Sequence, residues 1–224
     1  MKSEKLISKE LPSNIRAVLF DYDGVVADTM QDNLHAWQQA FSDAGVNITA
    51  EEYYSREGMT PSAIARELGT QKGLSEEVIA DIPTKKAQYY RSNNSFRLYP
   101  EVTNIVKKIK DRGLKLALVT GALRHRVEEM TPKDLLELFD VVISADDITY
   151  PKPDPEPYQK ALEKLNVQPS EAVVIENAPL GIESAKRAGC FVVAIETTLP
   201  QSRLIQADTI IKSHEHLPGL FDIL

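Results

Sequence analysis

Cysteine is almost absent from this sequence of 224 residues. Cys190 is the only one, so no disulfide can form within the chain. That usage fits the reducing cytoplasm, and we expect a cytoplasmic protein. Cys190 opens the apolar run 190–195, which predicts a buried thiol in a strand rather than a reactive one.

Long apolar runs and an excess of positive charge are missing as well. No stretch is apolar over the length of a membrane span, and residues 1–14 are polar, so we expect neither a membrane segment nor a signal peptide. The 33 Asp and Glu outnumber the 26 Lys and Arg, which gives a net charge of −7. This balance argues against a surface for nucleic acid. The length suits one α/β core with a small insertion.

What the sequence does contain is a pair of carboxylates directly after an apolar run. Residues 17–20 predict a buried strand, and Asp21 and Asp23 follow it. Neighbouring carboxylates repel each other and resist burial, so a core strand does not usually end this way. Gly24 then permits a sharp turn. The pattern indicates a site for a cation or for chemistry, and the alternative is a solvated acidic turn.

Further polar groups follow other apolar runs that are typical of strands. In chain order they are Thr120 with Gly121, then Lys152, then Glu176 with Asn177. The carboxyl ends of parallel strands meet at one edge of a sheet, where ligands bind. From residue 99 onward, strand and helix patterns alternate, which predicts a doubly wound parallel α/β sheet. We therefore expect all these groups in one crevice.

The region between the first strand and residue 95 has no strand pattern. Apolar residues recur there at helical spacing, and Thr49 with Glu52 forms a capping-box pattern, so we predict an all-helical insertion. The expected units are a catalytic core over 1–28 and 97–224 and a helical cap over 29–96.

Three polar residues outside these motifs also receive predictions. Lys86 falls on the expected solvated face of a helix over 75–91, and contact with the distal groups of a substrate is the alternative. Thr131, directly ahead of Pro132, has the pattern of a helix N-cap. His214 belongs to the tail 214–216, which we expect to be an exposed loop, with metal binding as the alternative.

In this order, the motifs resemble those of the haloacid dehalogenase superfamily of phosphotransferases. The run 21–26 resembles the first motif, Thr120 the second, Lys152-Pro153 the third and Glu176-Asn177 the fourth. The resemblance extends from about Arg16 to the last strand. It is closest to the subgroup of beta-phosphoglucomutases and phosphoglycolate phosphatases, which implies a Rossmann-like core with a helical cap inserted between the first two motifs.

The resemblance also implies a reaction through an aspartyl-phosphate. Asp21 would be the nucleophile. Asp23 would protonate the leaving oxygen and then activate water. Its presence favours phosphate esters over carbon–halogen bonds, because dehalogenases lack this second aspartate. Lys152 would neutralise the nucleophile and the transition state. The implied phosphate contacts are Gly24, Thr120, Gly121, Ala122 and Lys152.

Magnesium is the implied cofactor. The three carboxylates face one lysine, so a phosphate could not approach without another cation. The implied ligands are Asp21, the Asp23 carbonyl, Glu176 and Asn177. Asn177 stands where the subgroup usually has aspartate. We therefore expect weaker magnesium binding than in close relatives, with Glu176 taking a larger part in it.

Cap residues bear on the choice between hydrolase and mutase. Asn33 takes the place of a mutase histidine that couples to the acid/base aspartate, and Pro61 that of an arginine that grips a second phosphate. We predict a magnesium-dependent phosphatase for a small phosphorylated metabolite. A phosphosugar mutase and a non-catalytic phospholigand-binding module are the alternatives. Asp28 and Thr29 are expected at the hinge, Thr60 in the cap loop, and the protein as a monomer or weak homodimer.

Overall fold

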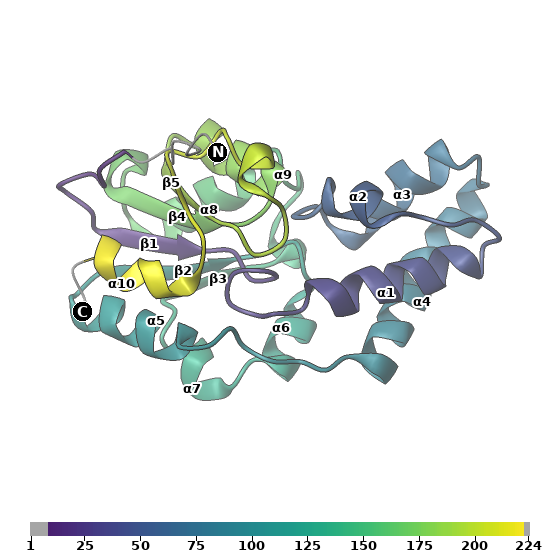
Figure 1. Ribbon diagram of the computed structural model, residues 1–224, viewed down its shortest axis with the longest axis horizontal. Coiled ribbons are helices and arrows are strands. Elements are labelled where there is room, and N and C mark those ends of the chain that lie inside the picture. Colours follow the sequence, from purple (N-terminus) through teal and green to yellow (C-terminus); the bar gives the residue numbers. More distant parts are fainter. Residues whose placement is uncertain (1–8, 222–224) are drawn as a thin grey trace, which may run out of the picture.

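The computed structural model describes residues 9–221 and consists of a sheet-centred core beside a group of four helices (Figure 1). Six parallel strands form the sheet in the order β3-β2-β1-β4-β5-β6. The strands are β1 (Ala17–Phe20), β2 (Lys115–Val119), β3 (Val141–Ile143), β4 (Ala172–Glu176), β5 (Phe191–Ile195) and β6 (Thr209–Ile211). The predicted doubly wound α/β fold is confirmed.

The central strand β1 is buried on both faces, which explains its continuous apolar sequence. Val18 and Phe20 pack on one side of the sheet, whereas Ala17 and Leu19 pack on the other. The first side is covered by α5 (Val102–Asp111), α6 (Arg124–Met130), α7 (Lys133–Leu136) and α10 (Leu217–Leu220). The second is covered by α8 (Glu156–Leu165) and α9 (Pro179–Arg187).

The remaining helices form a separate body with its own apolar core, which we call the cap. They are α1 (Met30–Ser42), α2 (Ala50–Tyr54), α3 (Pro61–Gln71) and α4 (Glu76–Asn93). Trp37, Phe41 and Leu68 are among the side chains buried between them. Thr49 and Glu52 form the predicted capping box at the start of α2. Figure 1 shows the cap beyond one end of the core, next to α6.

Two chain segments connect the cap to the core, and they run side by side. Ala27 pairs with Leu98 in an antiparallel bridge. The Asp28 amide donates to the Arg97 carbonyl at 2.9 Å, and the Arg97 Nε donates to Asp28 Oδ2 at 2.7 Å. Both connections to the cap thus lie side by side, at the position where we predict the hinge.

Two smaller predictions are wrong. Thr131 does not cap a helix, because α7 begins at Lys133 and the Thr131 hydroxyl is hydrogen-bonded to the Tyr22 hydroxyl at 2.8 Å. His214 is buried rather than exposed: its Nε2–H donates to the Val25 carbonyl at 2.6 Å, and its ring stacks on Tyr99. In both cases a contact distant in the sequence decides the environment.

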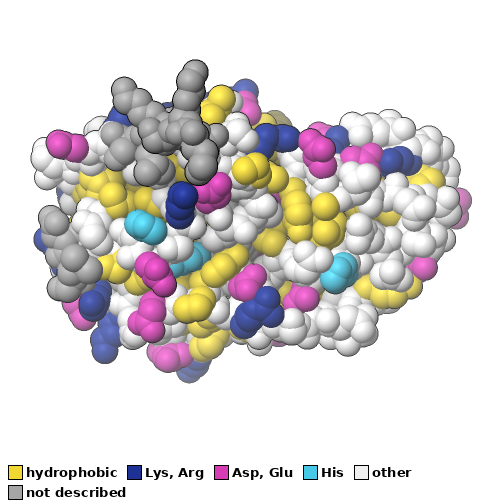
Figure 2. All heavy atoms as spheres, in the orientation of Figure 1, with side chains coloured by type: hydrophobic (Ala, Val, Ile, Leu, Met, Phe, Trp, Pro, Cys, Tyr) yellow, Lys and Arg dark blue, Asp and Glu magenta, His cyan; other side chains and the backbone are white. Residues whose placement is uncertain are grey.

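Charges of both signs are interspersed on the face of the molecule in Figure 2, without an extended patch of Lys and Arg. Within residues 9–221, no helix is long and apolar enough to cross a membrane.

Candidate active site

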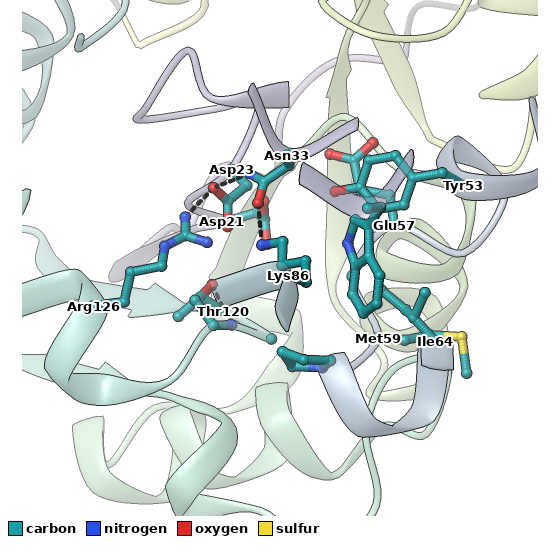
Figure 3. Close-up of a pocket in the computed structure, with 15 residues that line it drawn as sticks. Asp21, Asp23, Asn33, Tyr53, Glu57, Met59, Ile64, Lys86, Thr120 and Arg126 are labelled. Atoms are coloured by element: carbon teal, nitrogen blue, oxygen red, sulfur yellow. Dashed lines mark hydrogen bonds and ion pairs between the residues drawn. The ribbon is translucent and has the colours of Figure 1, made fainter. Parts of the chain in front are cut away.

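Asp21 and Asp23 leave the carboxyl end of β1 and line a cavity between core and cap (Figure 3). The Asp21 amide continues the pairing to β4 by donating to the Ile175 carbonyl at 3.0 Å. Gly24 then turns the chain with φ of +90°, a conformation that favours glycine. A Cβ at Gly24 would lie 2.1 Å from Asn177 Nδ2, so this turn also requires the absence of a side chain.

Lys152 joins the first and fourth motifs. Its Nζ donates to Asp21 Oδ1 at 2.6 Å and to Glu176 Oε1 at 2.7 Å, and its side chain is 1% exposed. Burial opposes the charge, but Asp21 and Glu176 together raise the pKa of Lys152, which therefore stays an ammonium. Burial raises the pKa of Asp21 to about 8 even though Lys152 opposes the rise. One ammonium thus does not compensate for burying this carboxylate beside Glu176.

Glu176 has all of its acceptor capacity in use. Its Oε1 accepts from Lys152 and from the Tyr158 hydroxyl at 2.9 Å. Its Oε2 accepts from the backbone amides of Asn177 at 2.8 Å and Ala178 at 3.0 Å. A Cβ on Gly181 would collide with this carboxylate, which shows how closely α9 approaches it. This arrangement positions Glu176 to hold Lys152 against Asp21.

Asp23 is held by three donors on its Oδ1. Thr29 donates its hydroxyl, Asn33 donates Nδ2–H at 3.3 Å, and Arg126 forms an ion pair with it. The dashed lines in Figure 3 show Arg126 reaching this carboxylate from one side and Asn33 from the other. Residues of the hinge, the cap and α6 thus fix the orientation of the predicted acid/base.

Thr120 directly follows β2, lines the same cavity and is 2% exposed. Its Oγ1 accepts from the Ala122 amide at 3.0 Å, which tightens the loop that follows the strand. Gly121 and Ala122 also line the cavity.

The cap closes directly onto this loop. A Cβ at Gly121 would lie 2.7 Å from the Met59 carbonyl and 2.8 Å from the Gly58 carbonyl, so core and cap touch through backbone atoms. The adjacent Glu57 reaches into the core, where its Oε1 accepts from Asn177 Nδ2 at 2.6 Å. The space between them, which we call the inner cavity, measures about 50 Å³. That volume admits only a few small groups beside Asp21.

A larger groove of about 970 Å³, which we call the outer groove, lies between the cap and α6. Lys86 and Arg126 line both spaces. They therefore stand where a ligand would pass from the outer groove to Asp21.

Four buried side-chain atoms lack a hydrogen-bond partner among the residues that the structure describes, and all four belong to residues around this site. They are Glu57 Oε2, Asn177 Oδ1, Arg126 Nε and the Tyr90 hydroxyl. Native proteins pair nearly all buried polar atoms, so a cluster of exceptions indicates a missing ligand. The first two are acceptors and fit a cation. Arg126 Nε is a donor and fits an anion.

This site geometry agrees with the comparison to known proteins. The profile of the haloacid dehalogenase-like hydrolases matches residues 18–195.

The chain belongs to this family.

Among its relatives in the haloacid dehalogenase-like family is a validoxylamine A 7'-phosphate phosphatase from Streptomyces hygroscopicus. It is 33% identical over 200 residues, which cover 88% of this chain and 93% of the relative. A candidate beta-phosphoglucomutase from Bacteroides vulgatus has the same fold, with a TM-score of 0.83, 31% identity and coverage of 94% and 90% of the two chains. The predicted family and subgroup are confirmed.

CbbY from Rhodobacter sphaeroides is a further structural relative in this family. Its complex with phosphate aligns with a TM-score of 0.76 and 27% identity over 93% of this chain and 99% of CbbY. A second CbbY structure, in complex with xylulose-1,5-bisphosphate, aligns with a TM-score of 0.73 and 27% identity, covering 89% of this chain and 94% of CbbY.

The structure brings the predicted residues of all four family motifs to one place. Asp21, Thr120, Lys152, Glu176 and Asn177 are all at most 5% exposed. Of the predicted cap and hinge residues, Thr29 and Asn33 contact Asp23 and Asp28 pairs with Arg97 across the hinge. Thr60 instead caps α3, accepting from the Ala63 amide at 3.4 Å, and lines only the outer groove.

Glu57, Tyr90 and Arg126 line the site without having been predicted from the sequence, and the predicted solvated position of Lys86 is wrong. Lys86 is 7% exposed and donates to Asn33 Oδ1 at 2.5 Å. A signal for Lys86 was present, because Ile79, Ile82, Lys86 and Tyr90 form one stripe on α4 at helical spacing. A lysine in an apolar stripe is a candidate for a buried, functional cation. No comparable pattern marks Glu57 or Arg126.

Proposed function

We propose that the protein is a phosphatase that hydrolyses a small phosphorylated metabolite through an aspartyl-phosphate on Asp21, with magnesium as cofactor. We further propose that the leaving group carries a negative charge near the scissile bond. The observation that carries this second step is the unpaired Arg126 Nε beside Lys86, at the boundary between inner cavity and outer groove.

The first half of the reaction transfers the phosphoryl group to the enzyme. An Asp21 carboxylate oxygen attacks phosphorus while the bond from phosphorus to the leaving oxygen breaks. Asp23 gives its proton to that oxygen. Lys152, 2.6 Å from Asp21, offsets the negative charge in the transition state, and Thr120 lies at the end of the neighbouring strand where it can donate to phosphoryl oxygens.

In the second half, water attacks the phosphorus of the aspartyl-phosphate. Asp23 takes a proton from that water, the bond from Asp21 to phosphorus breaks, and inorganic phosphate leaves. Bound magnesium would supply positive charge to the phosphoryl oxygens throughout. Beside the predicted ligands Asp21 and the Asp23 carbonyl, the unpaired Asn177 Oδ1 and Glu57 Oε2 are acceptors among the described residues that fit such a cation.

An anionic leaving group explains why two cations lie beside the acid/base. Arg126 pairs with Asp23, and Lys86 reaches the same carboxylate through Asn33. Both cations have donors to spare, because Arg126 Nε has no partner and Lys86 makes one hydrogen bond among the described residues. A carboxylate or second phosphate of the substrate would satisfy them and draw Arg126 away from Asp23.

The relatives support the same chemistry. CbbY, 27% identical, has been solved with a sugar that carries two phosphates. In this chain Pro61 lines the inner cavity where a phosphosugar mutase would need its arginine. A hydrolase therefore fits the site better than a mutase.

The test is phosphate release from matched pairs of esters that differ in the charge of the leaving group. Suitable pairs are phosphoglycolate with hydroxyethyl phosphate, and xylulose-1,5-bisphosphate with xylulose 5-phosphate. We expect kcat/KM to be at least about tenfold higher for the charged member of each pair. Asp21→Asn should release no phosphate from any of them.

Lys86→Met should remove most of this preference, whereas Lys85→Met should leave it unchanged. Lys85 is the matched control because it is the preceding residue on α4, is only half-buried, and forms its one ion pair within residues 9–221 with Asp81. Equal rates for charged and neutral members would refute the anionic leaving group alone. No release from any ester would refute the phosphatase and favour a mutase, which conversion of β-glucose 1-phosphate in the presence of glucose 1,6-bisphosphate would reveal.

A further inference from the structure

The cap supplies a carboxylate to the core at the position where the fourth motif has lost one. We propose that Glu57 is a ligand of the cation, together with Asn177, and that cation binding is thereby coupled to closure of the cap. This inference rests on the proposed function only in taking the cation to be the cofactor of that reaction.

The first observation is geometric. Glu57 lies in the loop between α2 and α3, yet it is 4% exposed and its Oε1 lies 2.6 Å from Asn177 Nδ2 in the core. Its other oxygen, Oε2, has no partner in the described chain. Asn177 is fully buried, and its Oδ1 is likewise without a partner. Two neighbouring, hydrogen-bonded residues thus each have a buried acceptor atom without a partner, and a cation would satisfy both.

The second observation concerns charge. No Lys, Arg or His side chain in residues 9–221 pairs with Glu57, and a buried carboxylate without a cationic partner is strongly destabilising. A divalent cation removes this penalty, since it binds carboxylate and amide oxygens together.

The third observation argues against Glu176 as the main ligand of the cation. Glu176 already accepts two hydrogen bonds on each oxygen, so it is less suited to replace the missing aspartate than we predicted from the sequence. No three carboxylate, imidazole or thiolate side chains of the described chain converge on one point. A cation site here must therefore include an amide or a backbone carbonyl, and Asn177 Oδ1 provides the first.

Coupling to cap closure follows from where Glu57 is attached. The next residue, Gly58, packs against Lys152, where a Cβ would lie 3.1 Å from its Cδ. The loop reaches Asn177 only while it rests on the core. A cation that gains a ligand in the closed state favours that state, and closure raises its affinity by the same factor.

The experiment is magnesium titration of the whole protein without substrate, by calorimetry and by the fluorescence of Trp37. Trp37 is the only tryptophan, and it lies in the cap where it lines the inner cavity. We expect Glu57→Gln to weaken magnesium binding by at least about tenfold and to abolish the fluorescence change. Glu77→Gln is the matched control on the exposed part of the cap, and it should behave as wild type.

Cation ligation and its coupling to cap closure can be tested separately by moving the carboxylate from position 57 in the cap to position 177 in the core. The double variant Glu57→Gln with Asn177→Asp should regain the magnesium affinity but not the fluorescence change. Wild-type affinity in Glu57→Gln would overturn the proposal, as would a double variant that binds no better than Glu57→Gln.

Folding is checked by the midpoint of thermal unfolding without magnesium. Glu57→Gln should leave this midpoint unchanged or raise it, because an amide of nearly the same shape replaces a buried carboxylic group that has no cationic partner. The titration needs no hydrolysis, so a failure of the proposed phosphatase would leave its result intact. Conversely, normal magnesium binding by Glu57→Gln in an active phosphatase would overturn only this inference.

Discussion

The Lys86 ammonium donates to Asn33 Oδ1 at 2.5 Å, and the Asn33 amide nitrogen lies 3.3 Å from Asp23 Oδ1. The same nitrogen donates to the Thr29 carbonyl at 3.0 Å. Both ends of the Asn33 amide are therefore hydrogen-bonded, one to the buried Lys86 and the other to Asp23, the proposed acid/base of the core. Because Asn33 cannot take up a proton, it orients Asp23 without competing for the proton that Asp23 transfers.

Replacing Asn33 with alanine should lower kcat by about tenfold, because it frees Asp23 and removes the only hydrogen bond described for Lys86. KM should change less, since Lys86 and Arg126 remain. Steady-state kinetics with the preferred ester measure both constants. Gln31→Ala is the control, since Gln31 lies on the exposed side of α1. An unchanged kcat in Asn33→Ala would contradict the positioning role.

The pH dependence of substrate binding should report on Lys86. Burial lowers the pKa of Lys86 to about 7, and Arg126 acts in the same direction while Asp23 opposes it. Lys86 is thus charged below about pH 7 and neutral above it. An anionic leaving group binds the charged form, so KM should rise by up to about tenfold per unit above pH 7.

Phosphoglycolate suits this measurement because its carboxylate keeps its charge from pH 7 to 9. In Lys86→Met the KM should be higher and independent of pH over this range. In Lys86→Arg it should stay low and flat, because an arginine remains protonated. A wild-type KM that is flat between pH 7 and 9 would contradict the role of Lys86.

The strands and motifs could be predicted from the sequence because their environment is local. A parallel strand buried on both faces needs an unbroken apolar run, and the ends of these strands fix where the polar groups meet. The burial of Lys86 could not be predicted in this way, because it depends on how the cap packs against the core. Glu57 likewise lies 120 residues from the Asn177 that it contacts.

The prediction of helix N-caps from the sequence is limited in the same way by contacts that are distant in the chain. Asp154 precedes Pro155 as Thr131 precedes Pro132, and Asp154 Oδ1 does accept from the first helical amide, that of Glu156, at 2.9 Å. Thr131 has an equally good local pattern, but its hydroxyl bonds to Tyr22 instead. Tertiary contacts decide between two local options of similar free energy.

Gly121→Ala should impair closure without unfolding the protein. The new Cβ would lie 2.7 Å from the Met59 carbonyl, and backbone atoms cannot move aside as a flexible side chain can. Closure should become unfavourable, so kcat/KM should fall by at least about tenfold, while the midpoint of thermal unfolding changes little.

Gly219→Ala serves as the comparison, because no atom lies within 4 Å of its added Cβ. Small-angle scattering should show Gly121→Ala as the more extended of the two. If Gly121→Ala matched Gly219→Ala in both activity and scattering, the backbone contact would not control closure.

Cys190 should be inert in the folded protein. It is 2% exposed, and burial raises the pKa of its thiol to about 12, so almost no thiolate exists at pH 8. A thiol reagent such as dithionitrobenzoate should label no cysteine in buffer and one per chain in denaturant. Rapid labelling in buffer would contradict the burial of Cys190.

The separate apolar cores of cap and sheet bear on how such a protein can diverge. Asp21, Asp23 and Lys152, to which we assign the chemistry, all belong to the core. A cap with other side chains at the position of Lys86 could therefore change the leaving group while the proposed chemistry persisted. Glu57 limits that freedom. A lineage that exchanged this cap for one without the glutamate would have to restore an aspartate at Asn177, and the two positions are therefore expected to change together.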